Sequence, residues 1–157
     1  MAIISDEDKE YIKSRFKKEM EKEVRVIFFT QDFECQFCRE TGEILKELKS
    51  LTDKIKLEVH EFQKEKELAE KYGVDKIPAI LLFGEKEYGI RFFGIPSGYE
   101  FSTLIEDVIH VSTGRTQLKE ETKKEVKKID KPLHIQFSSL PLAHIVRRWC
   151  ILPTRWQ

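Results

Sequence analysis

The sequence contains no asparagine, no long apolar run and no excess of charge of either sign. Its 28 Lys and Arg residues balance 28 Asp and Glu residues, which gives no reason to expect nucleic acid as a partner. No apolar run reaches the roughly 18 residues of a membrane span, and the first ten residues, MAIISDEDKE, lack the basic start and apolar core of a signal peptide. We therefore expect a cytoplasmic protein that binds neither nucleic acid nor membranes. The lack of asparagine together with abundant Lys and Glu is typical of proteins from hyperthermophiles.

Charge is distributed unevenly along the chain. Residues 1–131 hold every Lys, Asp and Glu, and they carry 25 basic against 28 acidic side chains. The last 26 residues hold none of these three types, but they hold three Arg, both Trp and three of the five Pro. Apolar residues make up 40% of the chain and charged residues 36%, which predicts a packed core under a charged surface. The abrupt change predicts that the last 26 residues are not part of the same folded unit.

Apolar periodicity predicts alternating helices and strands in residues 1–131. Strands are predicted over residues 24–30 (VRVIFFT, buried on both faces), 54–62, 78–83 and 88–94, with a further strand beginning at 133–137. Helices are predicted over residues 5–20, from the first loop to about residue 51, over 64–72, from a Ser97–Glu100 capping box onward, and around 118–129. Phe92 and Phe93 in the fourth strand are predicted to be core residues. This order predicts an α/β domain.

Two of the three cysteines form the motif Cys35-Gln36-Phe37-Cys38, which follows the predicted buried strand. We expect Cys35 at the start of a helix, where unpaired N–H groups and the helix dipole favour a thiolate. A thiolate attacks disulfides, and a second thiol three residues later can resolve the mixed disulfide. Two alternatives remain open: a zinc site, for which no matching second pair of ligands is present, and a buried inert pair. Cys150 is left over, and a dithiol mechanism does not need it.

Pro78 opens a predicted strand, 43 residues after Cys35. Proline cannot donate a ladder hydrogen bond and therefore occurs at the first residue of a strand or at a sheet edge. An ordinary edge proline explains Pro78 when it is considered alone.

Several stretches taken together resemble the thioredoxin superfamily, and more closely the N-terminal unit of the protein disulfide oxidoreductases, or glutaredoxin-like proteins, of hyperthermophiles. The matching stretches, within residues 1–131, are ISDEDKEYIK, ECQFC, ELKSLTDKIK, KYGVDKIPA and RFFGIPSGYEF. The resemblance implies a thioredoxin fold: a mixed four-stranded sheet, flanked by helices, in which the strands are ordered second, first, third, fourth. For this chain the resemblance also implies an added helix at the N-terminus and an incomplete second unit at the C-terminus. Phe29 stands where thioredoxins carry a buried Asp.

The resemblance also implies roles for individual residues. Cys35 would be the nucleophile, Cys38 the resolving thiol and Pro78 a cis-proline facing the cysteine loop. Ile77 would offer its backbone to an extended substrate, with Gln36 and Phe37 beside it.

The function that follows is thiol–disulfide oxidoreduction on protein substrates. No cofactor is expected beyond a redox-active Cys35–Cys38 disulfide, and no metal. The expected partners are protein disulfides or dithiols and an electron donor such as a thioredoxin-reductase-like flavoprotein. Two alternatives remain open: a non-catalytic module that binds extended peptides, and an inactive remnant of a two-unit enzyme.

The domain boundaries follow from the same comparison. Residues 1–115 are predicted to form the thioredoxin-fold unit, residues 116–131 a helical linker or the start of a second unit, and residues 132–157 an aberrant, poorly packed tail that exposes Trp149 and Trp156. The tail is predicted to be a frameshift product, with an ordinary docked tail as the alternative. Read from the third base of the Phe137 codon, residues 137–147 permit Phe-Val-Thr-Pro-Thr-Cys-Pro-Tyr-Cys-Pro, a second Cys-x-x-Cys motif. The gene sequence tests this reading at the wobble positions of Leu142 and Ile145.

Overall fold

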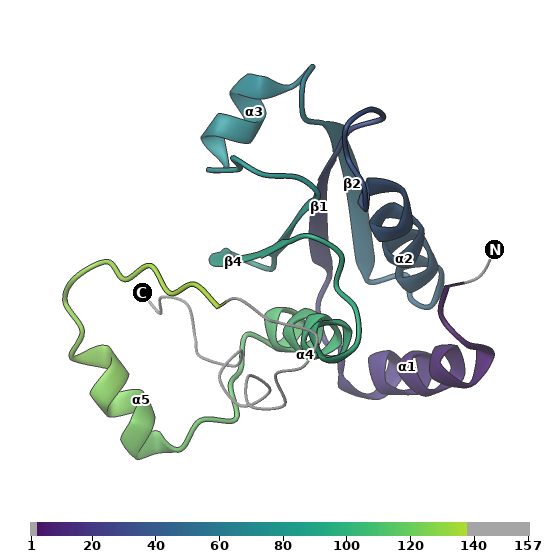
Figure 1. Ribbon diagram of the computed structural model, residues 1–157. Helices are drawn as coiled ribbons and strands as arrows, with labels where there is room; N and C mark the ends of the chain where they lie inside the picture. Colours follow the sequence, from purple (N-terminus) through teal and green to yellow (C-terminus); the bar gives the residue numbers. More distant parts are fainter. Residues whose placement is uncertain (1–2, 138–157) are drawn as a thin grey trace.

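The computed structural model describes residues 3–137, which contain nine helices and strands (Figure 1). In chain order these elements are α1 (Asp6–Glu19), β1 (Val24–Thr30), α2 (Cys38–Ser50), β2 (Ile55–Glu61), α3 (Lys66–Lys71), β3 (Ala79–Phe83), β4 (Glu87–Phe93), α4 (Tyr99–Thr113) and α5 (Glu120–Lys127). The predicted helices and strands are confirmed, apart from the strand expected at residues 133–137. Those residues form neither helix nor strand, and their side chains are exposed, because no described strand lies beside them to pair with.

The four strands form one mixed sheet in the order β2-β1-β3-β4, as the resemblance implied. β1 pairs in parallel with β2, and β1–β3 and β3–β4 are antiparallel. The two central strands, β1 and β3, consist almost entirely of buried apolar residues, because both of their faces and both of their edges are covered. The fold class is therefore the mixed α/β sheet of the thioredoxin fold.

Helices cover both faces of the sheet, so that the domain has three layers (Figure 1). On one face, α1, α2 and α4 bury a core that includes Phe16, Phe28, Leu48 and Leu104, each 2% exposed or less. On the other face, a smaller core around Phe29 and Leu81 packs against α3. Alternate residues of one strand point to opposite faces, so that Phe28 and Phe29 of β1 anchor the two cores separately.

The first and the fourth helix begin at residues that favour a helix start for different reasons. The Ser5 hydroxyl accepts a hydrogen bond from the Asp8 amide at 3.1 Å and caps α1, as its sequence predicts. The fourth helix differs from its prediction: its N-cap is Gly98 rather than Ser97. The backbone at Gly98 has a positive φ of 57°, and glycine adopts this conformation without the steric cost that other residues carry.

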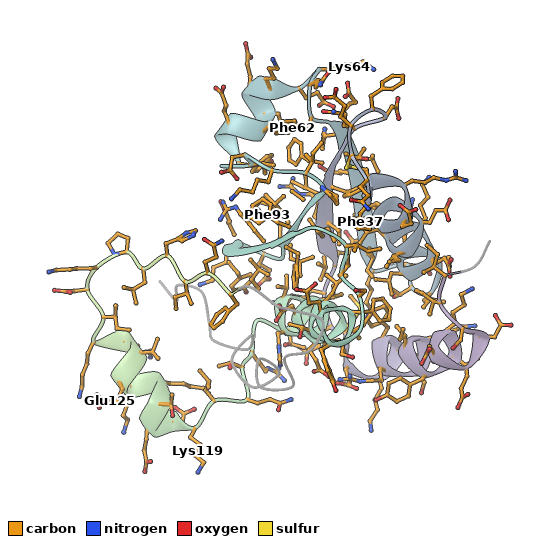
Figure 2. The ribbon with its side chains drawn as sticks, viewed as in Figure 1. Phe37, Phe62, Lys64, Phe93, Lys119 and Glu125 are labelled. Atoms are coloured by element: carbon orange, nitrogen blue, oxygen red, sulfur yellow. A yellow bond between two sulfur atoms is a disulfide. The ribbon has the colours of Figure 1, made fainter. Side chains whose placement is uncertain are left out.

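The segment after α4 departs from the body of the domain. α5 buries none of its residues, and in Figure 2 the labelled Lys119 and Glu125 mark this region, set apart from the sheet. The predicted boundaries at residues 115 and 131 stay predictions. The predictions for the tail, including those for Trp149 and Trp156, fall on residues outside 3–137, apart from the unpaired segment 132–137. No helix within the described residues is long and apolar enough to cross a membrane.

Candidate redox site

The sheet topology places the cysteine motif and Pro78 at the same end of the sheet. Phe29, near the end of β1, pairs with Ala79, the first residue of β3. Residues 31–37 form the loop that leaves this end of β1, and Pro78 immediately precedes Ala79. The peptide bond between Ile77 and Pro78 is cis. Two segments more than 40 residues apart in sequence are thus brought to one end of the sheet.

Cys35 and Cys38 form a disulfide, with their Cα atoms 5.5 Å apart. Cys38 is buried, with 3% of its surface exposed, whereas Cys35 is half-buried. This difference matches the two roles expected of the pair, because the attacking sulfur must be reached from outside and the resolving sulfur need not be. Among the described residues no cluster of three or more metal-ligating side chains is present.

The start of α2 differs from its prediction. The helix begins at Cys38, and its first main-chain hydrogen bond runs from the Thr41 amide to the Phe37 carbonyl at 3.0 Å. Cys35 therefore lies ahead of the helix, in the loop, and Cys38 occupies the first helical position. Glu34, just before Cys35, has a left-handed φ of 56°.

A hydrogen bond within residues 31–37 stabilises this loop. The Gln31 side chain, 9% exposed, donates a hydrogen bond from Nε2 to the Phe33 carbonyl. This contact joins the two ends of a short segment, and Phe33 itself is 80% exposed. Sequence reasoning missed both residues, since neither lies in the Cys-x-x-Cys motif.

Three exposed aromatic residues come from segments at this end of the sheet. Phe33 comes from the loop. Phe37 is the N-cap residue of α2 and is 41% exposed, and Phe93 ends β4 and is 44% exposed; Figure 2 labels Phe37 and Phe93. Phe93 pairs with Ala79, and the amide of the following residue donates to the Pro78 carbonyl at 2.9 Å. We call Phe33, Phe37 and Phe93 the aromatic rim.

The prediction that Phe93 is a core residue was wrong, whereas Phe92 does pack against the larger core. The sequence did hold a signal for this difference. Neighbouring side chains of a strand point to opposite faces of the sheet, so only one of Phe92 and Phe93 could join that core.

Of the four predicted substrate-binding residues, Ile77 is half-buried, Pro78 is buried, and Gln36 and Phe37 are exposed. The nearby Lys76 ammonium lies 6.0 Å from the centroid of the Phe93 ring and adds positive charge at the margin of the aromatic rim.

The interior position where thioredoxins carry a carboxylate holds the fully buried ring of Phe29. Phe29 lies 5.4 Å, centroid to centroid, from His60, its register partner on β2. His60 Nδ1 in turn lies 2.7 Å from Glu65, and this hydrogen bond is the main cause that lowers the pKa of the Glu65 carboxyl. The interior position is thus held by the apolar ring of Phe29. The hydrogen-bonded pair of His60 and Glu65 lies half-buried at the β2 edge of the sheet.

Comparisons with known proteins agree with this geometry. A family model described as thioredoxin matches residues 7–107. The alkylhydroperoxide reductase component AhpF from Enterococcus faecalis is 26% identical with a TM-score of 0.70, and the match covers 78% of this chain and 59% of that one. A protein disulfide oxidoreductase from Aeropyrum pernix is 21% identical, also with a TM-score of 0.70, over 78% of this chain and 54% of that one. This chain thus matches less than two thirds of the length of either relative. Comparison with curated protein sequences gives no match.

Proposed function

The chain belongs to the thioredoxin family, and we propose that it exchanges its Cys35–Cys38 disulfide with cysteines in extended segments of other proteins. A thioredoxin-fold domain with a Cys-x-x-Cys pair supports thiol–disulfide oxidoreduction in general. The finer assignment to protein substrates rests mainly on one observation. The half-buried Cys35 is bonded to the buried Cys38, and three exposed aromatic residues come from segments at the same end of the sheet, which suits the binding of a polypeptide.

The reaction needs the two thiols in turn. In the reduced chain, the Cys35 thiolate attacks one sulfur of a substrate disulfide, and the other substrate sulfur leaves as a thiolate that takes up a proton. Cys38 then loses its proton and attacks the Cys35 sulfur, which releases the second substrate thiol and closes the Cys35–Cys38 disulfide. Two electrons pass from the cysteine pair to the substrate, and the reverse sequence oxidises a substrate dithiol.

Ile77 and the aromatic rim supply the proposed docking surface. A substrate strand laid beside Ile77 would pair through its backbone and thus be read without regard to most of its side chains. Phe33, Phe37 and Phe93 would cover apolar side chains that flank the substrate cysteine, and Gln36 would offer polar contacts. This division predicts broad specificity for unfolded or extended chains.

Turnover requires a source of two electrons to reopen the Cys35–Cys38 disulfide. We propose a thioredoxin-reductase-like flavoprotein as that donor, and no bound cofactor in the chain itself. The expected result is that such a flavoprotein with NADPH sustains turnover, while NADPH without it does not.

Reduction of insulin disulfides by the purified chain, with dithiothreitol as the reductant, tests the proposal. Cys35→Ser is expected to abolish turnover, and Cys38→Ser to accumulate mixed disulfides on Cys35. Cys150→Ser is the matched control and should keep full activity. If the wild-type chain binds unfolded peptides without reducing insulin, the peptide-binding alternative replaces the enzyme. Adducts trapped on Cys38 in the Cys35→Ser chain would reverse the two roles.

A further inference from the structure

Thr41 carries a buried hydroxyl with no hydrogen-bond partner. Its side chain is fully buried, and Oγ1 is the single buried side-chain nitrogen or oxygen without a partner in residues 3–137. Buried polar groups are nearly always paired, so an exception needs a structural or functional reason.

The position of Thr41 points to such a reason. Thr41 lies three residues after Cys38, and residues at this spacing share one face of a helix. Helical side chains lean toward the N-terminus of the helix, which directs the Thr41 side chain toward the turn that begins at Cys38.

The usual partner of a helical threonine is not used. Such hydroxyls commonly donate to the carbonyl four residues earlier, here that of Phe37. That carbonyl accepts the Thr41 amide at 3.0 Å, and the hydroxyl makes no bond to it. The hydroxyl is therefore available to a partner that appears in another state of the site.

We propose that Thr41 is a positioning residue whose hydroxyl donates a hydrogen bond to the Cys38 sulfur in the reduced chain, and that this bond is absent while the disulfide is closed. The inference rests on the proposed function, since it concerns the same cysteine pair. When an external dithiol delivers two electrons, the Cys35–Cys38 bond breaks, the dithiol becomes a disulfide, and each cysteine sulfur gains one electron and takes up a proton or remains a thiolate. The two sulfurs then separate to van der Waals contact. The Cys38 sulfur, which no longer shares an electron pair with Cys35, becomes the hydrogen-bond acceptor that the Thr41 hydroxyl lacks in the oxidised chain.

The surroundings of Cys38 make this contact consequential. The sulfur is buried, and burial in apolar surroundings disfavours a thiolate. Phe29 stands where thioredoxins carry a buried carboxylate, so the hydroxyl is the polar group that the helix itself brings toward the buried thiol. A bond made only in the reduced state stabilises the dithiol relative to the disulfide and raises the reduction potential of the pair.

Redox equilibration with glutathione buffers measures this effect directly. Thr41→Val keeps the shape of the side chain and removes the hydroxyl. The equilibrium is expected to move toward the disulfide by about fivefold, which corresponds to about 20 mV. Thr41→Ser restores the hydroxyl and should return most of the shift. Thr103→Val is the matched control, because Thr103 is a half-buried helical threonine whose hydroxyl already donates to the Tyr99 carbonyl at 3.1 Å.

The stability of the two redox states provides a second readout. Thr41→Val should raise the stability of the oxidised chain, from which it removes an unpaired polar group, and should not raise that of the reduced chain. Equal changes in both states, with an unaltered redox equilibrium, would show a purely structural threonine and overturn the inference. A wild-type pair that does not equilibrate with glutathione at all would instead refute the proposed function.

Discussion

Asp107→Asn is expected to stabilise the folded chain at pH 8 and to leave its stability at pH 4 unchanged. Asp107 lies on α4 among residues that pack on the sheet, and only 7% of its surface is exposed. Burial, reinforced by the neighbouring charge of Glu106, raises the pKa of this carboxyl from 3.8 to about 7. In the unfolded chain, where the carboxyl is hydrated, the pKa returns to its ordinary value.

The sign and the magnitude follow from these two values. Between pH 3.8 and 7 the folded chain keeps a proton that the unfolded chain has lost, so the contribution of Asp107 to stability falls as the pH rises. A window of about three pH units, at about 1.4 kcal/mol per unit, amounts to about 4 kcal/mol lost by pH 7. Asparagine cannot ionise, so the Asp107→Asn chain avoids this loss.

Urea denaturation of both oxidised proteins at intervals from pH 4 to 8 measures the difference. Other carboxyls titrate alike in the two proteins and cancel when the free energies of unfolding are subtracted. Asp53→Asn, at an exposed turn, is the matched control and should show no pH-dependent difference. If the difference between wild type and the Asp107→Asn chain stays constant across this pH range, the argument from burial is refuted.

Three further changes test other parts of the structure. In Gly84→Ala, a Cβ would lie 2.7 Å from the Val111 carbonyl oxygen, so we expect a loss of about 1–3 kcal/mol in urea denaturation; an unchanged midpoint would contradict that close approach. Arg15→Lys exchanges the guanidinium that lies 2.6 Å from Glu106 for an ammonium without the planar fork, and should cost about 1 kcal/mol; a double-mutant cycle with Glu106→Gln that gives no coupling would refute this. Phe33→Ser removes a ring that is 80% exposed, so stability should change by less than about 0.5 kcal/mol, while KM for insulin rises severalfold; an unaltered KM would remove Phe33 from the docking surface.

The strands were predictable because each carries a strong local pattern. The run VRVIFFT has the apolar and β-branched composition of a strand covered on both faces, and β1 is such a strand. The order of the strands required the resemblance, since composition does not say which strands pair. The failed strand at residues 133–137 shows the limit of local pattern, because a strand must also lie against another strand, and these residues are exposed and unpaired.

The details of the site depend on tertiary contacts and could not be predicted in the same way. The helix begins at Cys38 rather than Cys35, and Glu34 just before the motif adopts a left-handed conformation that nothing in its residue type requires. Asp107 follows another acidic residue and looks like part of a solvated face, yet the docking of α4 buries it. The unpaired hydroxyl of Thr41 is likewise visible only once its surroundings are known.

The pairing of Phe29 with Ala79 has a consequence for the order in which the chain is made. A ribosome that adds about 5–20 residues per second needs roughly 3–10 s to travel from one to the other. During that interval the central strand lacks one neighbour, and Cys35 and Cys38 have been synthesised without the segment that closes their end of the sheet. Cys150 is added only after all four strands have been made. Synthesis from the N-terminus therefore gives Cys35 and Cys38 time to form their disulfide before Cys150 exists to compete for either thiol.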